Sequence, residues 1–231
     1  MALITASFPR TVRMCEVYFY RSVILYLREF CKLASIIASN CLKHLTEFST
    51  IVNEILKYNK EFVANKGYEK FITNKYPDKK IAILSCMDTR LTELLPAALG
   101  IKNGDVKMIK NAGGIISHPF GSVIRSLLVA IFELGVTDVM VVAHSDCGAC
   151  HMSAQQMIEH MKARGIHQDK IDMIRYCGVD FEKWLYGFGD TEKSVRETVE
   201  AIVNHPLIPH DIQVHGFIID SHTGELTRVD C

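Results

Sequence analysis

The sequence lacks an excess of charge of either sign, because its 231 residues carry 26 basic and 26 acidic side chains. A general nucleic-acid-binding protein needs a basic excess to meet phosphates, so we expect no nucleic-acid partner. The chain also has no internal repeat and no low-complexity stretch. Its eight cysteines are sparse for this length, whereas disulfide scaffolds are typical of short secreted domains. Reduced thiols or thiolate metal ligands in a cytosol-like compartment are the better expectation.

The first 45 residues differ in charge from the rest, with six basic and only two acidic side chains. They lack the run of about 18 nearly charge-free residues that a membrane span needs, because Arg21, Arg28 and Glu29 interrupt the apolar stretch. A clean signal-peptide core is also missing. A transit peptide, an added amphipathic helix and a misassigned start stay open. We therefore predict an N-terminal extension, residues 1–45, and a main domain, residues 46–231. A cytoplasmic location is favoured over organelle targeting through the extension.

Short apolar runs alternate with helical patterns after residue 46. Continuous apolar runs are typical of strands buried on both faces, and they occupy residues 81–84, 106–109, 138–143 and 212–219. Residues 225–229 are predicted to return as a short edge strand. Helical patterns cover residues 51–63, with a cap at Ser49 or Thr50, and residues 122–134, 150–164 and 191–204. Strands separated by helical crossovers predict an α/β fold, with a mostly parallel central β-sheet flanked by helices.

Metal-ligand side chains follow two of these predicted strands. The first run leads directly into Ser85-Cys86, and the third leads directly into His144-Ser145-Asp146-Cys147. In open α/β sheets, sites form at the carboxyl ends of the strands. Zinc takes thiolate sulfur and imidazole nitrogen, and a catalytic zinc commonly has three protein ligands and one open position. Cys86, His144 and Cys147 are therefore a candidate zinc site.

A thiol redox site is the alternative interpretation. Cys147 and Cys150 form a Cys-x-x-Cys pair at a predicted strand-to-helix turn, where a helix N-terminus can lower a thiol pKa. Each candidate ligand, taken singly, is also compatible with an ordinary buried position. The redox interpretation leaves Cys86, Asp88 and Arg90 without a role. The spacing therefore favours zinc while both interpretations stay open.

A carboxylate and a guanidinium follow Cys86 at alternate positions. In an extended chain Asp88 and Arg90 would point the same way. A carboxylate paired with a guanidinium stays ionised and fixed in orientation. Beside a metal-bound hydroxide, such an acceptor would fix where the hydroxide proton points. An ordinary ion pair in a loop is the alternative.

Two adjacent glycines, Gly113 and Gly114, follow the second predicted strand. Glycine permits positive φ angles and a close approach of the backbone. A turn of this kind is a candidate for lining a small substrate pocket with N–H groups, although most Gly-Gly pairs are simple turns.

Taken together, these residues resemble the β-class carbonic anhydrases, in their compact prokaryotic-type branch. The matching segments are Cys86-Met87-Asp88-Thr89-Arg90, Asn111-Ala112-Gly113-Gly114 and His144-Ser145-Asp146-Cys147-Gly148. The family pattern is Cys-x-Asp-x-Arg followed by His-x-x-Cys, with an Asn-Ala-Gly-like turn between them. All parts occur here in the right order. The resemblance covers roughly residues 46–231.

The resemblance implies a lyase that reversibly hydrates carbon dioxide to bicarbonate and a proton. It implies one Zn²⁺ per chain, held by Cys86, His144 and Cys147. Zinc hydroxide would attack carbon dioxide while Asp88 and Arg90 act as an orienting pair. Asp88 is also expected to be able to ligate the metal in a closed, resting form.

The resemblance further implies a homodimer or a higher homo-oligomer, with residues 122–134 as a candidate interface helix. Cys150 and His151 are not family ligands and are predicted to lie in the first turn of a helix. Two further functions stay open. One is a related zinc hydrolase acting on carbon disulfide or carbonyl sulfide, and the other is a zinc-stabilised module without turnover.

Overall fold

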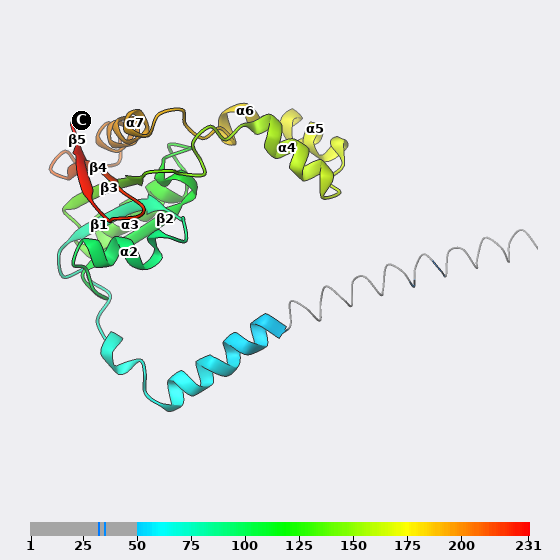
Figure 1. Ribbon diagram of the computed structural model, residues 1–231. Coiled ribbons are helices and arrows are strands. Elements are labelled where there is room, and N and C mark those ends of the chain that lie inside the picture. Colours follow the sequence, from blue (N-terminus) through cyan, green and yellow to red (C-terminus); the bar gives the residue numbers. More distant parts are fainter. Residues whose placement is uncertain (1–31, 33–34, 36–49) are drawn as a thin grey trace, which may run out of the picture. The chain divides into compact units, whose positions relative to one another are not determined.

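The computed structural model describes residues 32, 35 and 50–231 (Figure 1). The chain divides into two compact units, residues 1–70 and 71–231. Apart from residues 32 and 35, the predicted extension lies outside the described residues. Within the described part of the chain, no helix is both long and apolar enough to cross a membrane.

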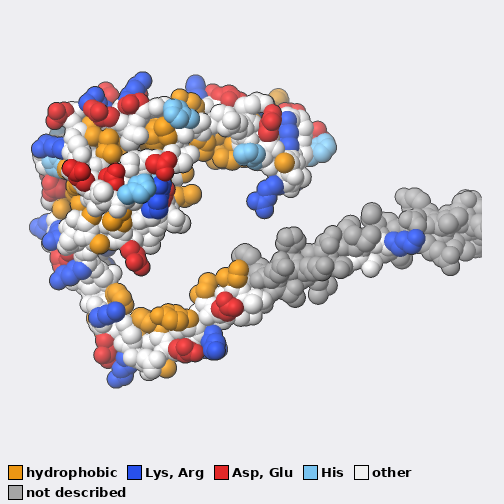
Figure 2. Space-filling view, viewed as in Figure 1, with side chains coloured by type: hydrophobic (Ala, Val, Ile, Leu, Met, Phe, Trp, Pro, Cys, Tyr) orange, Lys and Arg blue, Asp and Glu red, His pale blue; other side chains and the backbone are white. Residues whose placement is uncertain are grey.

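In the first unit, residues 50–64 are helical, which confirms the helix predicted over residues 51–63. The predicted cap at Ser49 lies outside the described residues. The apolar stripe of this helix is exposed, with Ile51 at 63% and Ile55 at 62% of full exposure, and hydrophobic side chains run along the helix in Figure 2. A short 3₁₀ helix, η1 (Glu69–Phe71), follows.

The second unit is built on a five-stranded sheet in the order β2-β1-β3-β4-β5. Its strands are β1 (Ile81–Cys86), β2 (Val106–Asn111), β3 (Asp138–His144), β4 (Gln213–Ile219) and β5 (Leu226–Val229). The first four run parallel, and only β5 pairs antiparallel, with β4. This confirms the mostly parallel sheet and the short edge strand predicted at residues 225–229.

Helices cover both faces of this sheet. The covering helices are α2 (Leu91–Ala98) on one face and α3 (Ser122–Leu134) and α7 (Thr191–Val203) on the other. Three further helices, α4 (Ala154–Ala163), α5 (Gln168–Tyr176) and α6 (Phe181–Trp184), pack around a separate small apolar cluster and extend away from the sheet in Figure 1. Because successive strand residues face opposite sides, Ala82 and Leu84 of β1 pack with residues of α3 and α7, whereas Ile83 packs with Leu91 and Leu95 of α2. The parallel pairing of β1 with β3 places the carboxyl ends of these two strands side by side between the helix layers.

The structure corrects one predicted helix start. Cys150 and His151 precede α4, which begins at Ala154 because the Ser153 side chain accepts a hydrogen bond from the Gln156 N–H at 3.1 Å. His151 has a left-handed backbone, with φ of 63°. The prediction that these two residues lie in a first helical turn is therefore wrong.

Candidate metal centre and active site

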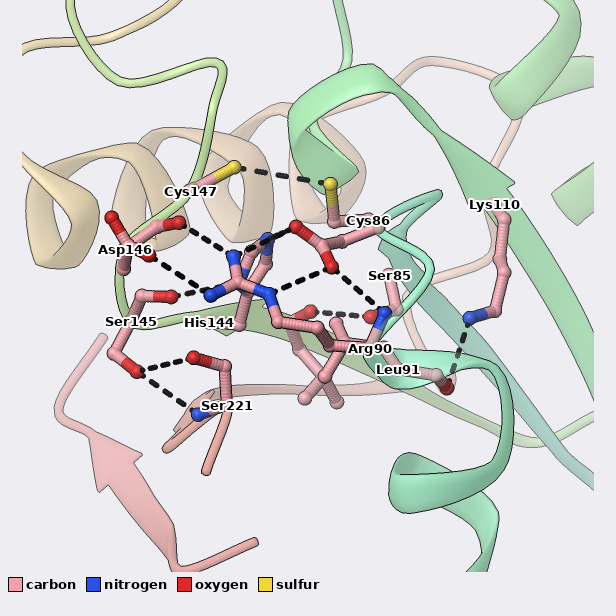
Figure 3. Close-up of polar contacts among 12 residues, drawn as sticks. Ser85, Cys86, Arg90, Leu91, Lys110, His144, Ser145, Asp146, Cys147 and Ser221 are labelled. Carbon is pink, nitrogen blue, oxygen red and sulfur yellow. Dashed lines mark hydrogen bonds and ion pairs between the residues drawn. The ribbon is translucent and has the colours of Figure 1, made fainter. Parts of the chain in front are cut away.

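The parallel pairing of β1 with β3 brings the three predicted ligands together. Ser85 lies opposite Val142 in this register, so Cys86 and His144 reach the same edge of the sheet. Ligand atoms of Cys86, His144 and Cys147 all lie within 4.8 Å of one another. The two sulfur atoms are 3.8 Å apart (Figure 3). Two thiolates on a tetrahedral zinc, each at about 2.3 Å, would be about 3.8 Å apart. The spacing therefore fits a zinc site.

The His144 ring is completely buried. Its Nδ1 lies 2.8 Å from the Ser145 carbonyl oxygen, and because a carbonyl only accepts, Nδ1 carries the proton. Nε2 therefore presents a free lone pair. Among the described residues, it is the one buried side-chain nitrogen or oxygen without a hydrogen-bond partner. Since an unpaired buried polar atom costs about 1–3 kcal/mol, the chemistry of Nε2 fits a metal ligand.

The two thiols are both buried, with Cys86 and Cys147 only 5% and 7% exposed. Burial opposes ionisation of Cys86, but the groups around it, among them the backbone N–H groups of Asp88 and Gly113, hold its pKa below the usual thiol value. Burial raises the pKa of Cys147, and the adjacent Cys86 raises it further. Protein groups alone therefore favour one thiolate and oppose the second. A divalent cation would offset both charges.

Asp88 and Arg90 form the pair that the sequence predicted, but through a turn and not an extended chain. Arg90 Nε donates to Asp88 Oδ1 at 3.0 Å and Nη2 donates to Oδ2 at 2.9 Å. The Arg90 backbone N–H adds a bond to Oδ1 at 2.9 Å. These bonds hold the pKa of Asp88 well below its usual range. Asp88 Oδ2 also lies 3.9 Å from His144 Nε2, so an ionised acceptor faces the ligand cluster.

A second aspartate on Arg90 was missed at the sequence level. Arg90 Nη1 donates to Asp146 Oδ2 at 2.9 Å, and Nη2 donates to the Asp146 carbonyl at 2.8 Å (Figure 3). Asp146 follows His144 by two residues, the same spacing that separates Asp88 from Cys86. That repeated spacing was the available signal. Arg90 thus joins the loop after β1, residues 87–90, to the loop after β3, residues 145–150. We name these segments the β1 loop and the β3 loop.

The predicted glycine turn lies directly behind a ligand. Gly113 and Gly114 are buried in η2 (Ala112–Gly114), with φ angles of 84° and 66°. A Cβ on Gly114 would lie 3.0 Å from the Cys86 nitrogen, and the Gly113 backbone helps to lower the pKa of Cys86. The Asn111 side chain closes this turn by accepting from the Ile115 N–H and donating to its carbonyl. The turn supports Cys86, and its place in a substrate pocket stays a prediction.

The geometry does not favour the redox alternative. Cys147 Sγ faces Cys86 Sγ at 3.8 Å, whereas Cys150 Sγ lies toward the Gly189 carbonyl at 3.9 Å. The Cys-x-x-Cys pair is therefore divided between two environments, and its first member belongs to the ligand cluster.

Comparisons with known proteins identify relatives of this chain. Residues 81–226 match the profile of the carbonic anhydrase family. The chain is 51% identical over 180 residues to "Putative carbonic anhydrase YtiB" of Bacillus subtilis (strain 168), a match that covers 78% of this chain and 96% of that one. A "Carbon disulfide hydrolase" of Acidithiobacillus thiooxidans is 28% identical over 158 residues, covering 64% of this chain and 76% of the relative.

The fold agrees with a solved structure as well. The crystal structure of β-carbonic anhydrase isoform I from Trichomonas vaginalis aligns with a TM-score of 0.71 and 34% identity, over 77% of this chain and 96% of that one. The sequence match, the shared fold and the site geometry point the same way. The chain therefore belongs to the carbonic anhydrase family, in its β class.

Proposed function

We propose that the protein interconverts carbon dioxide and bicarbonate with one zinc ion per chain, held by Cys86, His144 and Cys147. The observation that carries this proposal is the convergence of three metal-ligand atoms within 4.8 Å. The unpartnered Nε2 of His144 supports it further. When bound, zinc would supply Lewis acidity that brings the pKa of a water molecule toward about 7.

Asp88 is proposed to orient the attacking oxygen. An ionised carboxylate only accepts hydrogen bonds, so Asp88 fixes the direction of the O–H bond and leaves an oxygen lone pair toward carbon dioxide. Arg90 keeps Asp88 charged and in place through the paired hydrogen bonds at 3.0 and 2.9 Å. Carbon dioxide is small and apolar, so orientation contributes more than binding strength. We place Gly113 and Gly114 beside the substrate, since their turn adjoins Cys86.

We further propose that residues 46–231 form the catalytic domain, with residues 1–45 as an extension, and that the protein acts in the cytoplasm as a homodimer or higher homo-oligomer. The family match at residues 81–226 falls within the proposed domain. The exposed stripe on residues 50–64 and Phe132 of α3, which is 63% exposed, are apolar surfaces that self-association would cover. Light scattering after size-exclusion chromatography tests the assembly, and a monomer at micromolar concentration would contradict it.

The function is tested by stopped-flow carbon dioxide hydration across mildly acidic to alkaline pH, with zinc quantified by elemental analysis. We expect about one zinc per chain and activity that rises with pH. A steep loss toward low pH would support closure of Asp88 onto the metal. Stoichiometric zinc without hydration at any pH would contradict the proposal.

Carbon disulfide hydrolysis is the second candidate. It is favoured by the sequence similarity to a protein named for that activity, at 28% identity. Release of hydrogen sulfide from carbon disulfide, assayed on the same zinc-loaded preparation, distinguishes the two. Turnover of carbon disulfide without carbon dioxide hydration would replace the first proposal.

A further inference from the structure

Asp146 makes contacts that neither the metal site nor the Asp88–Arg90 pair explains. Its side chain is 77% exposed, and its hydrogen bonds run to Arg90 and not to a candidate metal ligand. Its backbone is left-handed, with φ of 52°, a conformation that aspartate and asparagine adopt more readily than most residues. In this conformation both the carboxylate and the carbonyl of Asp146 reach the same guanidinium.

The Arg90 guanidinium is held from two sides. It makes four hydrogen bonds, two to Asp88 and two to Asp146. The two aspartates lie on different loops, so Arg90 links the β1 loop to the β3 loop. A planar guanidinium that is hydrogen-bonded along two edges can neither rotate about its Nε–Cζ bond nor tilt without breaking a hydrogen bond on one side.

We propose that Asp146 is a positioning residue that locks the Arg90 guanidinium, and through it holds Asp88 in the orientation that faces the metal ligands. The inference rests on the proposed function for its effect on turnover. The restriction of Arg90 by Asp146 depends only on hydrogen bonds within this chain.

Charge alone does not account for the arrangement. Exposed ion pairs contribute little to stability, and Arg175 with Glu182 forms such a pair at 3.2 Å elsewhere in the chain. Asp146 differs because it adds a backbone carbonyl to the carboxylate and because its partner already holds a second carboxylate. Its effect is therefore expected on the orientation of Arg90 more than on stability.

The test compares Asp146→Asn and Asp146→Gly with the matched control Glu182→Gln. Asparagine and glycine both tolerate the left-handed backbone, so neither variant strains the loop. The first readout is NMR of zinc-loaded protein labelled with ¹⁵N-arginine, which reports rotation about the Nε–Cζ bond of Arg90. The signal is assigned by its absence in Arg90→Lys. We expect faster rotation in both Asp146 variants and no change in Glu182→Gln.

The second readout is the kinetics of carbon dioxide hydration. We expect kcat to fall about tenfold in the Asp146 variants with zinc content unchanged, at the lower end of what removing a partner that orients an active-site group costs. In an Asp88→Asn background, Asp146→Asn should lower kcat no further, because the two act through one chain of contacts.

The two readouts distinguish the proposed restriction of Arg90 from the proposed carbon dioxide hydration. Unchanged Arg90 rotation in both Asp146 variants would overturn the proposal, and so would an additive loss of kcat in the double variant. If the wild-type protein failed to hydrate carbon dioxide, the proposed function would be wrong. Faster Arg90 rotation in the Asp146 variants would still support the restriction of Arg90 by Asp146.

Discussion

The β1 loop and the β3 loop each carry an aspartate two residues after a candidate metal ligand, yet the two aspartates lie in different surroundings. The Asp88 side chain is 18% exposed and lies 3.9 Å from His144 Nε2. The Asp146 side chain is 77% exposed and contacts Arg90 from the solvent side. The same two-residue spacing from a candidate ligand thus places the two carboxylates in different environments. Burial and direction decide which carboxylate faces the candidate metal ligands.

The two loops are also anchored to different parts of the sheet. The β1 loop is joined to β2 through the Met87 N–H, which donates to the Asn111 carbonyl at 2.9 Å. The β3 loop is joined to the turn after β4, where the Ser221 N–H donates to Ser145 Oγ at 2.9 Å (Figure 3). Arg90 is the side chain that joins the loops to each other. Variants that act on one anchor at a time can therefore test each loop separately.

The largest effect is expected from Cys147→Ser in the β3 loop. A serine hydroxyl stays protonated at neutral pH and is a poor zinc ligand. Zinc should fall well below one per chain by elemental analysis, and nearly all hydration activity should be lost. Cys150→Ser is the matched control, since Cys150 Sγ lies toward Gly189 and outside the ligand cluster. Zinc loss in the control with zinc retained in Cys147→Ser would contradict the assigned ligand set.

The next largest effect is expected from Asp88→Asn in the β1 loop. The amide keeps the shape of the carboxylate but removes its charge and turns one acceptor into a donor. We expect zinc to be retained and kcat to fall about 10²- to 10³-fold, as for loss of one oriented group at a reacting centre. The comparison with Asp146→Asn sharpens the contrast between the loops. A larger loss from Asp146→Asn than from Asp88→Asn would reverse the roles assigned here.

The sequence predicted the ends of β1 and β3 well because each carries a buried apolar run and polar residues where that run stops. The spacing of Cys86, His144 and Cys147 was informative for this reason. The β2 run was also predicted to be buried on both faces, but β2 is an edge strand without a fully buried residue. The pairing of Asp88 with Arg90 was also foreseen, although the turn that makes it was not. The left-handed backbone of Asp146 was not predictable, because local propensity does not fix the path of a loop that is held by distant contacts.

The sequence was less informative about the helices. The α2 helix, Leu91–Ala98, was not predicted, and it contains Pro96, a residue that normally ends a helical pattern. The α4 helix was predicted to start too early, because its cap at Ser153 was overlooked. The apolar stripe on residues 50–64 was predicted correctly as a helix, but periodicity alone does not tell whether such a stripe is covered.

Gly114→Ala tests the support behind the β1 loop. Alanine at φ of 66° is strained, and its Cβ would lie 3.0 Å from the Cys86 nitrogen and 3.1 Å from the Ser85 carbonyl carbon. We expect a loss of about 2–3 kcal/mol in the free energy of unfolding, measured by denaturant titration. Gly148→Ala in the β3 loop is the control, because nothing lies within 4 Å of its Cβ position. Equal stability of the two variants would contradict the proposal that the turn at Gly114 supports Cys86 and the β1 loop.

A smaller effect is expected at the anchor of the β3 loop. Ser145→Ala leaves the Ser221 N–H without its acceptor, so we expect a loss of about 1–3 kcal/mol in the free energy of unfolding. Ser221→Ala removes the contact between the two hydroxyls, which are 3.1 Å apart, and a longer contact of Ser221 Oγ with His222 Nδ1 at 3.4 Å, and it should cost about 0.5–1.5 kcal/mol. Denaturant titration of both variants checks the order. A reversed order would mean that the backbone bond does not anchor the loop.

The smallest effect is expected at Asp220, in the exposed turn behind that anchor. Its carboxylate accepts from the Thr223 N–H at 2.7 Å and from the His222 N–H at 2.9 Å, and these bonds lower its pKa. Because the unfolded chain binds the proton more tightly, the stabilisation is present above the ordinary aspartate pKa of about 3.9 and is lost as the pH falls through the lowered folded value. The difference in unfolding free energy between wild type and Asp220→Asn should therefore shrink between pH 5 and pH 3. A difference that stays constant over that range would show that the charge on Asp220 does not stabilise this turn.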